Sequence, residues 1–377
     1  MKILAHLSRI LVGLTFIFSG FVKGIDPWGS AYKFIDYFNA MGLTWLAPVA
    51  FALGVLLAFA EFLIGASLLF SIKIRFFSWA ALFFMLFFTG LTFWIALYNP
   101  VSDCGCFGDA LVISNWETFY KNLVLIALTI IVFLYRKKTE CLLGPKTGNI
   151  LGALTIALYI GIVVYSYRHE PVIDFRPFKV GVNIPDAMKI PADAPHDVYE
   201  NAFYYKNKNT GEVKKFTEEN YPWQDTVNWV FEKMDEPRLV KKGYRPPIHN
   251  FTIETGEGEN ISDFFLYDEN YVFMLIAYDI NKTSTKNQDK INELANWALS
   301  NNLPFICLTA SLTDDCVQYA TETGAPYEFF HCDETTLKTI IRSNPGLLVI
   351  KNGTIEAKWH HNDIPDPETF RKKFLNK

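Results

Sequence analysis

The sequence predicts a bundle of membrane-spanning α-helices followed by a water-soluble α/β domain. Residues 1–167 are dominated by Leu, Ile, Val, Phe, Ala and Trp, whereas residues 168–377 hold most of the charges and most of the prolines. The end of the second half alternates short apolar runs with stretches of helical periodicity, which is typical of an α/β sheet. We therefore expect the first half to be surrounded by lipid and the second half by water.

Five apolar segments are long enough to cross a membrane, which takes about 20 largely apolar residues per helix. They are roughly residues 3–22, 45–71, 76–98, 119–135 and 149–167. Five such runs in succession leave no polar face for water, so a soluble helical core does not fit them. The first run has a charged start like a signal peptide, but no small-x-small cleavage site follows it cleanly, and we expect an uncleaved helix.

The basic residues of the short loops predict the orientation, because Lys and Arg stay on the cytoplasmic side. Lys73 and Arg75 follow the second span, and four more basic residues lie within 136–146 after the fourth. The loops at 26–44 and 99–117 then face outward, as does everything after the fifth span. We expect a multi-pass protein of the bacterial inner membrane, with a cytoplasmic N-terminus and a periplasmic C-terminal domain.

A pair of cysteines, Cys104 and Cys106, lies in the second outward loop, on the side where thiols are oxidised. Cysteines separated by one residue can close only a tight ring, and such a strained disulfide exchanges readily. Gly105 supplies the backbone freedom for this closure. We therefore interpret Cys104 and Cys106 as the candidate catalytic pair. The alternatives are a structural bond to another cysteine, or a metal site, for which only Asp103 and Asp109 lie close by.

Glu61 lies near the middle of the second predicted span. An ionisable group at membrane depth costs several kcal/mol and usually faces the bundle interior, so Glu61 is a functional candidate. The alternative is a buried hydrogen bond to Ser, Thr or Trp of a neighbouring helix that fixes the packing. A transport function would depend on this residue alone, since no internal repeat is visible.

Several motifs of the membrane half resemble a known family. RILVG at 9–13, FSGFVK at 18–23 and Asp26-Pro27 are similar to the opening of DoxX-type membrane proteins, whose second helix Glu61 and Gly65 match. CGCFG at 104–108 resembles the signature of the MauE branch. The resemblance covers about residues 1–138 and implies a four-helix bundle. It also implies a link to disulfide formation in a partner enzyme, or to membrane-associated oxidoreductase complexes.

The remaining chain is predicted to form three further parts. Residues 139–170 would be a cytoplasmic loop and a fifth, tethering helix, and residues 171–242 an extracytoplasmic linker. The linker should contain a β-hairpin, with strands at 198–205 and 212–216. Residues 243–377 would be the α/β domain. Its strands are expected at 272–278, 305–308, 328–331, 347–351 and 355–359, and its helices at 286–300, 314–323, 335–342 and 368–375.

This order of strands and helices resembles the thioredoxin fold in its membrane-tethered, redoxin-like form. Residues 247–253 and 258–264 look like the entry hairpin of that group, and Asn344-Pro345 stands where the family has a cis-proline beside the substrate chain. The resemblance therefore implies partner binding at Asn344 and Pro345. One departure is important: residues 278–283, where the family has its Cys-x-x-Cys, contain no cysteine.

The sequence contains four other cysteines and a histidine pair that could take part in thiol or metal chemistry. Cys141 is expected to stay reduced in the cytoplasm, and Cys307 to be a buried apolar residue of a strand. Cys316 and Cys332 could pair with each other, or one of them could meet Cys104 or Cys106. His360 and His361 are expected to lie in a solvated loop, and no metal site is identified.

Two functions fit these observations. The first is thiol–disulfide exchange at Cys104 and Cys106 with an extracytoplasmic protein that carries thiols and docks on the α/β domain. The second is a non-catalytic inner-membrane scaffold or accessory subunit of a cell-envelope complex. The net charge of −4 and the lack of a basic block argue against nucleic acid. No cofactor is identified, and the sequence names neither a quinone nor another thiol protein as the oxidant, nor an oligomeric state.

Overall fold

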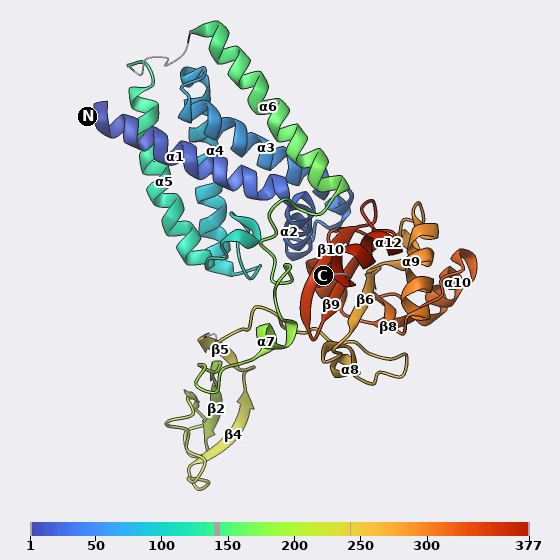
Figure 1. Ribbon diagram of the computed structural model, residues 1–377. Coiled ribbons are helices and arrows are strands. Elements are labelled where there is room, and N and C mark those ends of the chain that lie inside the picture. The colour runs from blue at the N-terminus through green and yellow to red at the C-terminus, as the bar shows by residue number, and fades with distance from the viewer. Residues whose placement is uncertain (1, 139–143, 242, 376–377) are drawn as a thin grey trace. The chain divides into compact units, whose positions relative to one another are not determined.

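A computed structural model of the chain describes residues 2–138, 144–241 and 243–375 (Figure 1). The chain divides into two compact units. The first comprises Met1–Val182 and Phe251–Lys377, and the second comprises Asn183–Asn250. The first unit begins with a helical apolar region and ends with a mixed α/β region, as the sequence predicts.

The helical region contains five helices that are long and apolar enough to cross a membrane, counted over the described residues. This is consistent with a multi-pass membrane protein, and each helix matches one predicted span. The helices are α1 (Lys2–Ile25), the 3-10 turn η1 (Thr44–Val49) continuing into α3 (Ala50–Leu69), α4 (Ile74–Tyr98), α5 (Asn115–Tyr135) and α6 (Pro145–Arg168).

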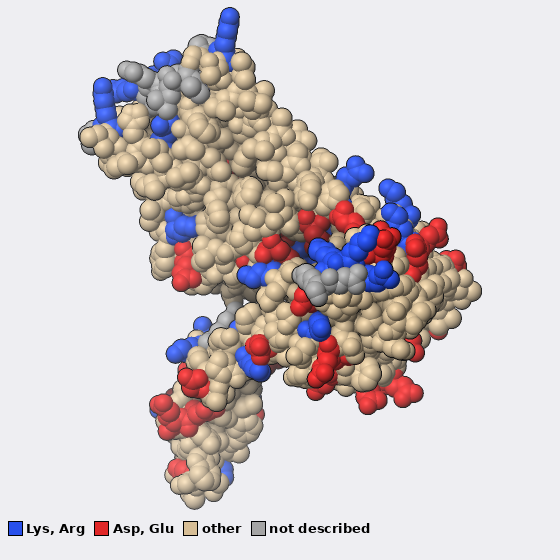
Figure 2. Space-filling model, viewed as in Figure 1, with Lys and Arg blue, Asp and Glu red and all other residues tan. Residues whose placement is uncertain are grey.

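Helices α1 and α3 pack with their backbones in close approach, because glycines stand at the crossing. A Cβ placed on Gly20 would lie 2.5 Å from the Phe62 backbone nitrogen, and one on Gly65 would lie 2.5 Å from that of Ile17. Small residues at such crossings are typical of helices packed in lipid. Figure 2 shows that the visible flank of the helical region is almost free of charge, with Lys, Arg, Asp and Glu gathered toward its ends.

A helix that the sequence analysis missed, α2 (Pro27–Ala40), occupies most of the segment predicted as an outward loop. Asp26 caps its start by accepting a hydrogen bond from the Gly29 amide at 2.9 Å, and Pro27 fits the first turn. An Asx cap followed by Pro is a helix-start signal. The segment is too short to span a membrane, so the apolar spans that place the other helices do not include it.

The mixed α/β region is built on a five-stranded sheet in the order β10-β9-β6-β7-β8. Strands β6, β7 and β8 are parallel, β9 runs antiparallel to β6, and β10 runs antiparallel to β9. The elements are α8 (Ser262–Leu266), β6 (Tyr271–Ile276), η3 (Ile280–Lys282), α9 (Gln288–Ser300), β7 (Phe305–Thr309), α10 (Thr313–Thr323), β8 (Glu328–His331), α11 (Glu334–Ile340), β9 (Gly346–Lys351), β10 (Thr354–His360), α12 (Pro367–Phe370) and η4 (Arg371–Leu375).

The core of this region forms where the apolar sides of β6, β7 and β9 meet those of α9, α10 and α12. Phe273, Leu275, Leu294 and Phe370 are fully buried in it. Burial on both faces explains why the central strands appear in the sequence as continuous apolar runs. The predicted strands and helices are thus present here, with ends that differ by a few residues. The Asn344–Pro345 peptide bond is cis, as predicted.

The entry hairpin predicted before β6 was wrong. Residues 247–253 form no strand, and the second predicted arm becomes α8. An isolated bridge joins Glu254 to Asn260, and the Ile261 amide donates to the Ile253 carbonyl at 2.8 Å. The reason is local side-chain bonding. The Ser262 hydroxyl accepts from the Ile253 amide at 2.8 Å, and Asn260 accepts from the Ser262 amide at 3.0 Å. Backbone bonds between the arms are therefore confined to a short turn, and side-chain bonds take the place of further ladder bonds.

The second unit is a small β structure that extends beyond the predicted hairpin. Its elements are α7 (Ile184–Met188), β1 (Val198–Glu200), β2 (Phe203–Asn207), β3 (Val213–Phe216), β4 (Trp229–Met234) and β5 (Arg238–Lys241). Strands β2 and β3 form the predicted antiparallel pair, joined at Phe203 and Phe216. Strand β4 adds to the other edge of β2, and β1 pairs with β5 in a separate ribbon.

Candidate functional site

The cysteine loop between α4 and α5 holds two half-buried thiols side by side. The sulfur atoms of Cys104 and Cys106 lie 3.1 Å apart, and both are free thiols. Gly105 between them has φ +67°, a left-handed conformation that a side chain would strain. A Cβ on Gly105 would also lie 2.8 Å from Cγ of Lys33. The glycine therefore allows the chain to turn tightly enough to bring the two sulfurs into contact.

Helix α2 holds this loop from one side. Lys33 Nζ lies 2.8 Å from Oδ2 of Asp103, whose other oxygen accepts a hydrogen bond from the Gly105 amide at 2.9 Å. The Tyr37 hydroxyl donates to the Cys104 carbonyl at 3.0 Å. Lys33 and Tyr37 were not predicted as site residues, because their segment was interpreted as a loop.

Helices α1 and α3 hold the loop from the other side through a buried polar cluster. Lys23 Nζ contacts Glu61 Oε2 at 2.7 Å and donates to the Ser19 hydroxyl at 2.8 Å. Ser19 Oγ lies 2.9 Å from Glu61 Oε2 and 2.8 Å from the Cys106 carbonyl. Its one proton serves one of these acceptors at a time. The cluster thus connects Glu61 to the backbone of the cysteine loop.

Glu61 faces the bundle interior and is only 6% exposed. Its main partner is a lysine, Lys23, which the sequence analysis did not single out. A signal for it exists: Lys23 stands four residues after Ser19, on the same face of α1, at the end of an apolar run. Buried charges need such a partner, because an unpaired one costs several kcal/mol.

The electrostatic environment makes the two thiols unequal. The hydrogen bond from the Cys104 thiol, with help from the positive charges of Lys121 and Lys23, lowers the pKa of Cys106 to about 6 despite its burial. Donating that hydrogen bond, together with burial, raises the pKa of Cys104. The pKa of Cys106 therefore lies below that of Cys104, and Cys106 is the thiol of the two that more readily forms a thiolate.

A cavity of about 860 Å³ lies beside the loop, entirely within the first unit. Cys104, Cys106, Lys23 and Glu61 belong to its lining. The rest of the lining is mainly apolar and aromatic. Its apolar members include Phe34 and Phe38 of α2, Leu53 and Leu57 of α3, and Phe84 and Leu91 of α4. The two sulfurs and the buried ion pair therefore line one cavity, whose wall combines apolar and charged side chains.

The α/β region contributes a charged contact to the rim of this cavity. Arg342, just after α11, lies 2.8 Å from Asp26 and 3.4 Å from Asp109. Burial alone would raise the pKa of Asp26, but the Arg342 guanidinium outweighs it and holds that pKa below its ordinary value. Lys338 of α11 and Arg342 also lie over the ring of Tyr32, at 5.2 and 5.4 Å from its centre.

Asn344 and Pro345, predicted to bind a partner, lie close to that contact in the chain. Asn344 donates to the Asp279 carbonyl at 2.7 Å and accepts from the Thr283 hydroxyl at 3.1 Å. Pro345 is buried, and its carbonyl accepts a hydrogen bond from Ser343. These bonds hold the segment after β6. Partner binding at Asn344 and Pro345 stays a prediction.

The other described cysteines lie in apolar surroundings. Cys307, Cys316 and Cys332 are all buried and free, so neither of the bonds considered from the sequence is formed among the described residues. Burial raises the pKa of Cys316 to about 11 and that of Cys332 to about 12. Cys307 lies in β7 as predicted, with a pKa well above the ordinary value. Cys141 lies outside the described residues.

The histidine pair is not a solvated loop, contrary to the prediction. Strand β10 continues to His360, which is 4% exposed, and burial lowers the pKa of His360 to about 3. His361 is within 2.9 Å of the Ser343 hydroxyl. The strand extends further than the apolar pattern indicated. Among the described residues no group of three or more His, Cys, Asp or Glu is placed to hold a metal ion.

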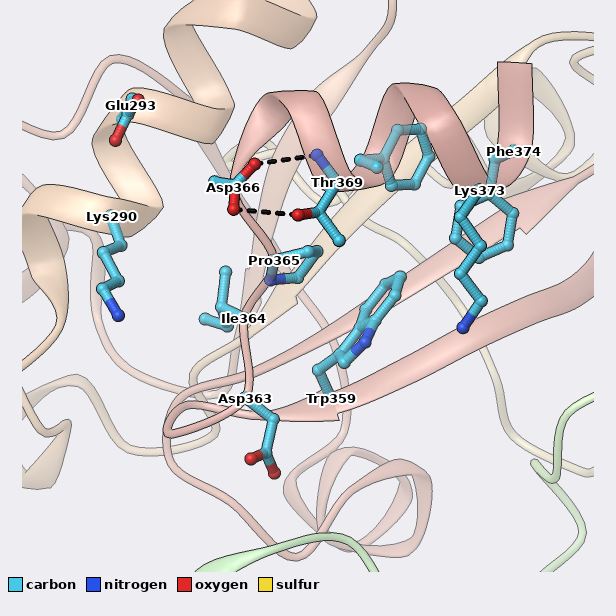
Figure 3. Close-up of a pocket in the computed structure, with 11 residues that line it drawn as sticks. Lys290, Glu293, Trp359, Asp363, Ile364, Pro365, Asp366, Thr369, Lys373 and Phe374 are labelled. Carbon is cyan, nitrogen blue, oxygen red and sulfur yellow. Dashed lines mark hydrogen bonds between the residues drawn. The ribbon is translucent and has the colours of Figure 1, made fainter. Parts of the chain in front are cut away.

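A second cavity, of about 390 Å³, lies in the α/β region between α9, β10 and α12 (Figure 3). In this view Asp366 caps α12 by bonding the amide and hydroxyl of Thr369, and Trp359 and Phe374 form an apolar wall. No cysteine belongs to its lining. Asp366 and Thr369 of this lining are used in capping, and the cavity holds no thiol, so the cysteine loop remains the candidate site.

Two comparisons with known protein families bear on the chain. No curated protein matches it. Residues 199–242 match a family model described as a domain of unknown function, and these residues cover most of the second unit. Residues 1–135 match a family model described as Methylamine utilisation protein MauE, which spans α1 to α5 together with the cysteine loop. The helical apolar region of this chain is therefore similar to the MauE family over its first 135 residues.

Proposed function

We propose that the chain is a thiol–disulfide redox protein of the bacterial inner membrane, which exchanges disulfides at Cys104 and Cys106 with an extracytoplasmic protein. The observation that carries the proposal is the contact between two unequal thiols, 3.1 Å apart, with the pKa of Cys106 lowered to about 6. The likeness of residues 1–135 to the MauE family supports a redox-associated accessory role. The basic loops support an outward orientation of the cysteines.

The exchange follows from the inequality of the two sulfurs. In the oxidised pair, a partner thiolate attacks the Cys104 sulfur and expels Cys106, since a thiol of low pKa is the better leaving group. A mixed disulfide forms as the Cys104–Cys106 bond breaks. The second thiol of the partner then displaces Cys104. The partner loses two electrons and two protons, and the chain gains them as two thiols.

We further propose that the α/β region is a thioredoxin-like module without a redox pair, used to dock the partner. Support comes from the order of its sheet, with parallel β6, β7 and β8 and antiparallel β9 and β10. The segment after β6 carries Tyr278 instead of a cysteine, and Tyr278 is hydrogen-bonded to Tyr32 of α2. A module fixed in this way holds a bound protein next to the cysteine loop.

The test is to trap the mixed disulfide in native membranes. In the Cys106→Ser variant the Cys104 thiolate attacks the disulfide of the oxidised partner and releases one partner thiol. No Cys106 is present to expel the partner again, so we expect a slower band on a non-reducing gel that disappears on reduction. Cys316→Ser is the matched control, because that thiol is buried away from the loop. If Cys104→Ser/Cys106→Ser membranes show the same envelope thiol status as wild type, the chain is a non-catalytic scaffold instead.

A further inference from the structure

After the cysteine pair has oxidised a partner, both cysteines are thiols. An oxidant must re-form the Cys104–Cys106 disulfide before the next exchange. The cavity beside the loop indicates what that co-reactant is. Its volume, about 860 Å³, falls within the range of about 300–1,000 Å³ that is typical of small-molecule sites. Apolar side chains of α2, α3 and α4 form much of its wall, and charged side chains, among them Asp36, Asp174 and Arg342, also line it. Such a wall can surround an apolar ligand and orient its polar end.

The mouth of the cavity opens on the apolar outer surface of the helices. Leu56, Phe87 and Met41 belong to the lining, yet their side chains are 60%, 64% and 40% exposed. These residues lie on or next to helices that are long and apolar enough to span a membrane. A ligand that reaches the cavity by this route comes from the lipid and is itself lipid-soluble.

The inner part of the cavity carries the reactive groups. Cys104 and Cys106 line it together with the buried cluster of Lys23 and Glu61, which the Ser19 hydroxyl connects to the Cys106 carbonyl. This cluster places an ammonium group and a carboxylate in the same cavity as the two sulfurs.

We propose that this cavity binds a lipid-soluble quinone, which oxidises the Cys104–Cys106 dithiol. The proposal rests on the exchange function proposed above. One sulfur–sulfur bond forms, two thiols lose their protons, and the two electrons and two protons convert both quinone carbonyls into hydroxyls. One quinone therefore oxidises one dithiol. The chemistry needs an oxidant that is apolar, flat and able to take two electrons, and these are the properties of a quinone.

Binding is tested on the full chain in lipid nanodiscs with a photoreactive azidoquinone. We expect label on peptides from α2, α3 and α4, and competition by decylubiquinone. Leu91→Trp fills the cavity from α4 and should reduce labelling about tenfold, equal to about 1.4 kcal/mol. Leu86→Trp is the matched control on the same helix, because Leu86 is 52% exposed and does not line the cavity.

Turnover is measured separately, from the loss of quinone absorbance when decylubiquinone meets the reduced chain. We expect one quinone reduced per dithiol, and no reduction by Cys104→Ser/Cys106→Ser, which should still be labelled. Mixed disulfides with a partner but no labelling in the cavity would overturn the quinone site alone. Labelling without thiol loss in the wild-type chain would overturn the redox step. Competition by phospholipid as effective as by quinone would assign the cavity to an acyl chain.

Discussion

The thiols of the helical region and those of the α/β region have the same chemistry but opposite surroundings. Cys106 lies beside a donating thiol and near Lys121 and Lys23, so its pKa falls to about 6. Cys332 is enclosed in the α/β region, and burial with the nearby charge of Asp333 raises its pKa to about 12. The comparison teaches that neighbouring donors and charges, more than burial itself, decide which cysteine of this chain can react.

The largest expected effect is a difference in alkylation between these two groups of thiols. At pH 7 the thiolate fraction is about 0.9 for a pKa near 6 and about 10⁻⁵ for a pKa near 12. We expect iodoacetamide to modify Cys106 faster than Cys332 by several orders of magnitude in the native membrane, read by quantitative mass spectrometry. Equal rates would remove the contrast, and denatured protein is the control in which both react alike.

The next effect concerns the contact that the α/β region makes with Asp26. Arg342→Ala leaves two carboxylates, Asp26 and Asp109, without their guanidinium, and removing one partner of a buried pair costs about 3–5 kcal/mol. We expect a lower denaturant midpoint at pH 7. Because the pKa of Asp26 is lowered in the folded chain, its contribution is present above its ordinary pKa and is lost as pH falls through the folded value.

The Arg342 effect should therefore shrink in acid. Measuring the midpoints of wild type and Arg342→Ala at pH 7 and at pH 3 checks both the size and the sign. Arg238→Ala is a control of the same chemical change, since Arg238 is an exposed residue of β5 in the second unit. A gap between wild type and Arg342→Ala that widens in acid would contradict the assignment.

A smaller effect is expected from Gly105→Ala. Gly105 has a left-handed φ of +67°, a conformation that costs a residue with a Cβ about 1–2 kcal/mol of stability. The methyl group of the alanine would also displace Lys33. The two sulfurs should separate, so the hydrogen bond that lowers the pKa of Cys106 weakens. Alkylation of Cys106 at pH 6 should slow, whereas Gly90→Ala, which meets no atom within 4 Å, should leave it unchanged.

The smallest effect is a shift in one titration. Lys121→Gln removes a positive charge that favours the Cys106 thiolate, so the midpoint of the alkylation rate against pH should move upward by less than about one unit. Lys121→Arg keeps the charge and should keep the midpoint near 6. An unchanged midpoint in Lys121→Gln would leave the Cys104 thiol as the main cause of the lowered pKa.

The sequence by itself determined the two-part architecture and indicated the cysteine pair as the candidate site. Long apolar runs have one physical solution, a helix with its backbone bonds satisfied internally, so the five spans could be predicted closely. Apolar runs alternating with helical periods likewise predicted β6 to β10 with small errors at their ends. Cys104 and Cys106 were found because a one-residue spacing on a glycine is a local property, visible without any tertiary contact.

Only the tertiary structure decided what surrounds that pair. Lys23 meets Glu61 across two helices, Lys33 and Tyr37 come from a helix mistaken for a loop, and Arg342 reaches Asp26 over 316 positions of sequence. Local spacing marks Lys23 and the start of α2, but which groups meet across elements is set by helix packing. The pKa of each thiol and the cavity beside the loop depend on these contacts, because distances between charges exist only in the folded chain.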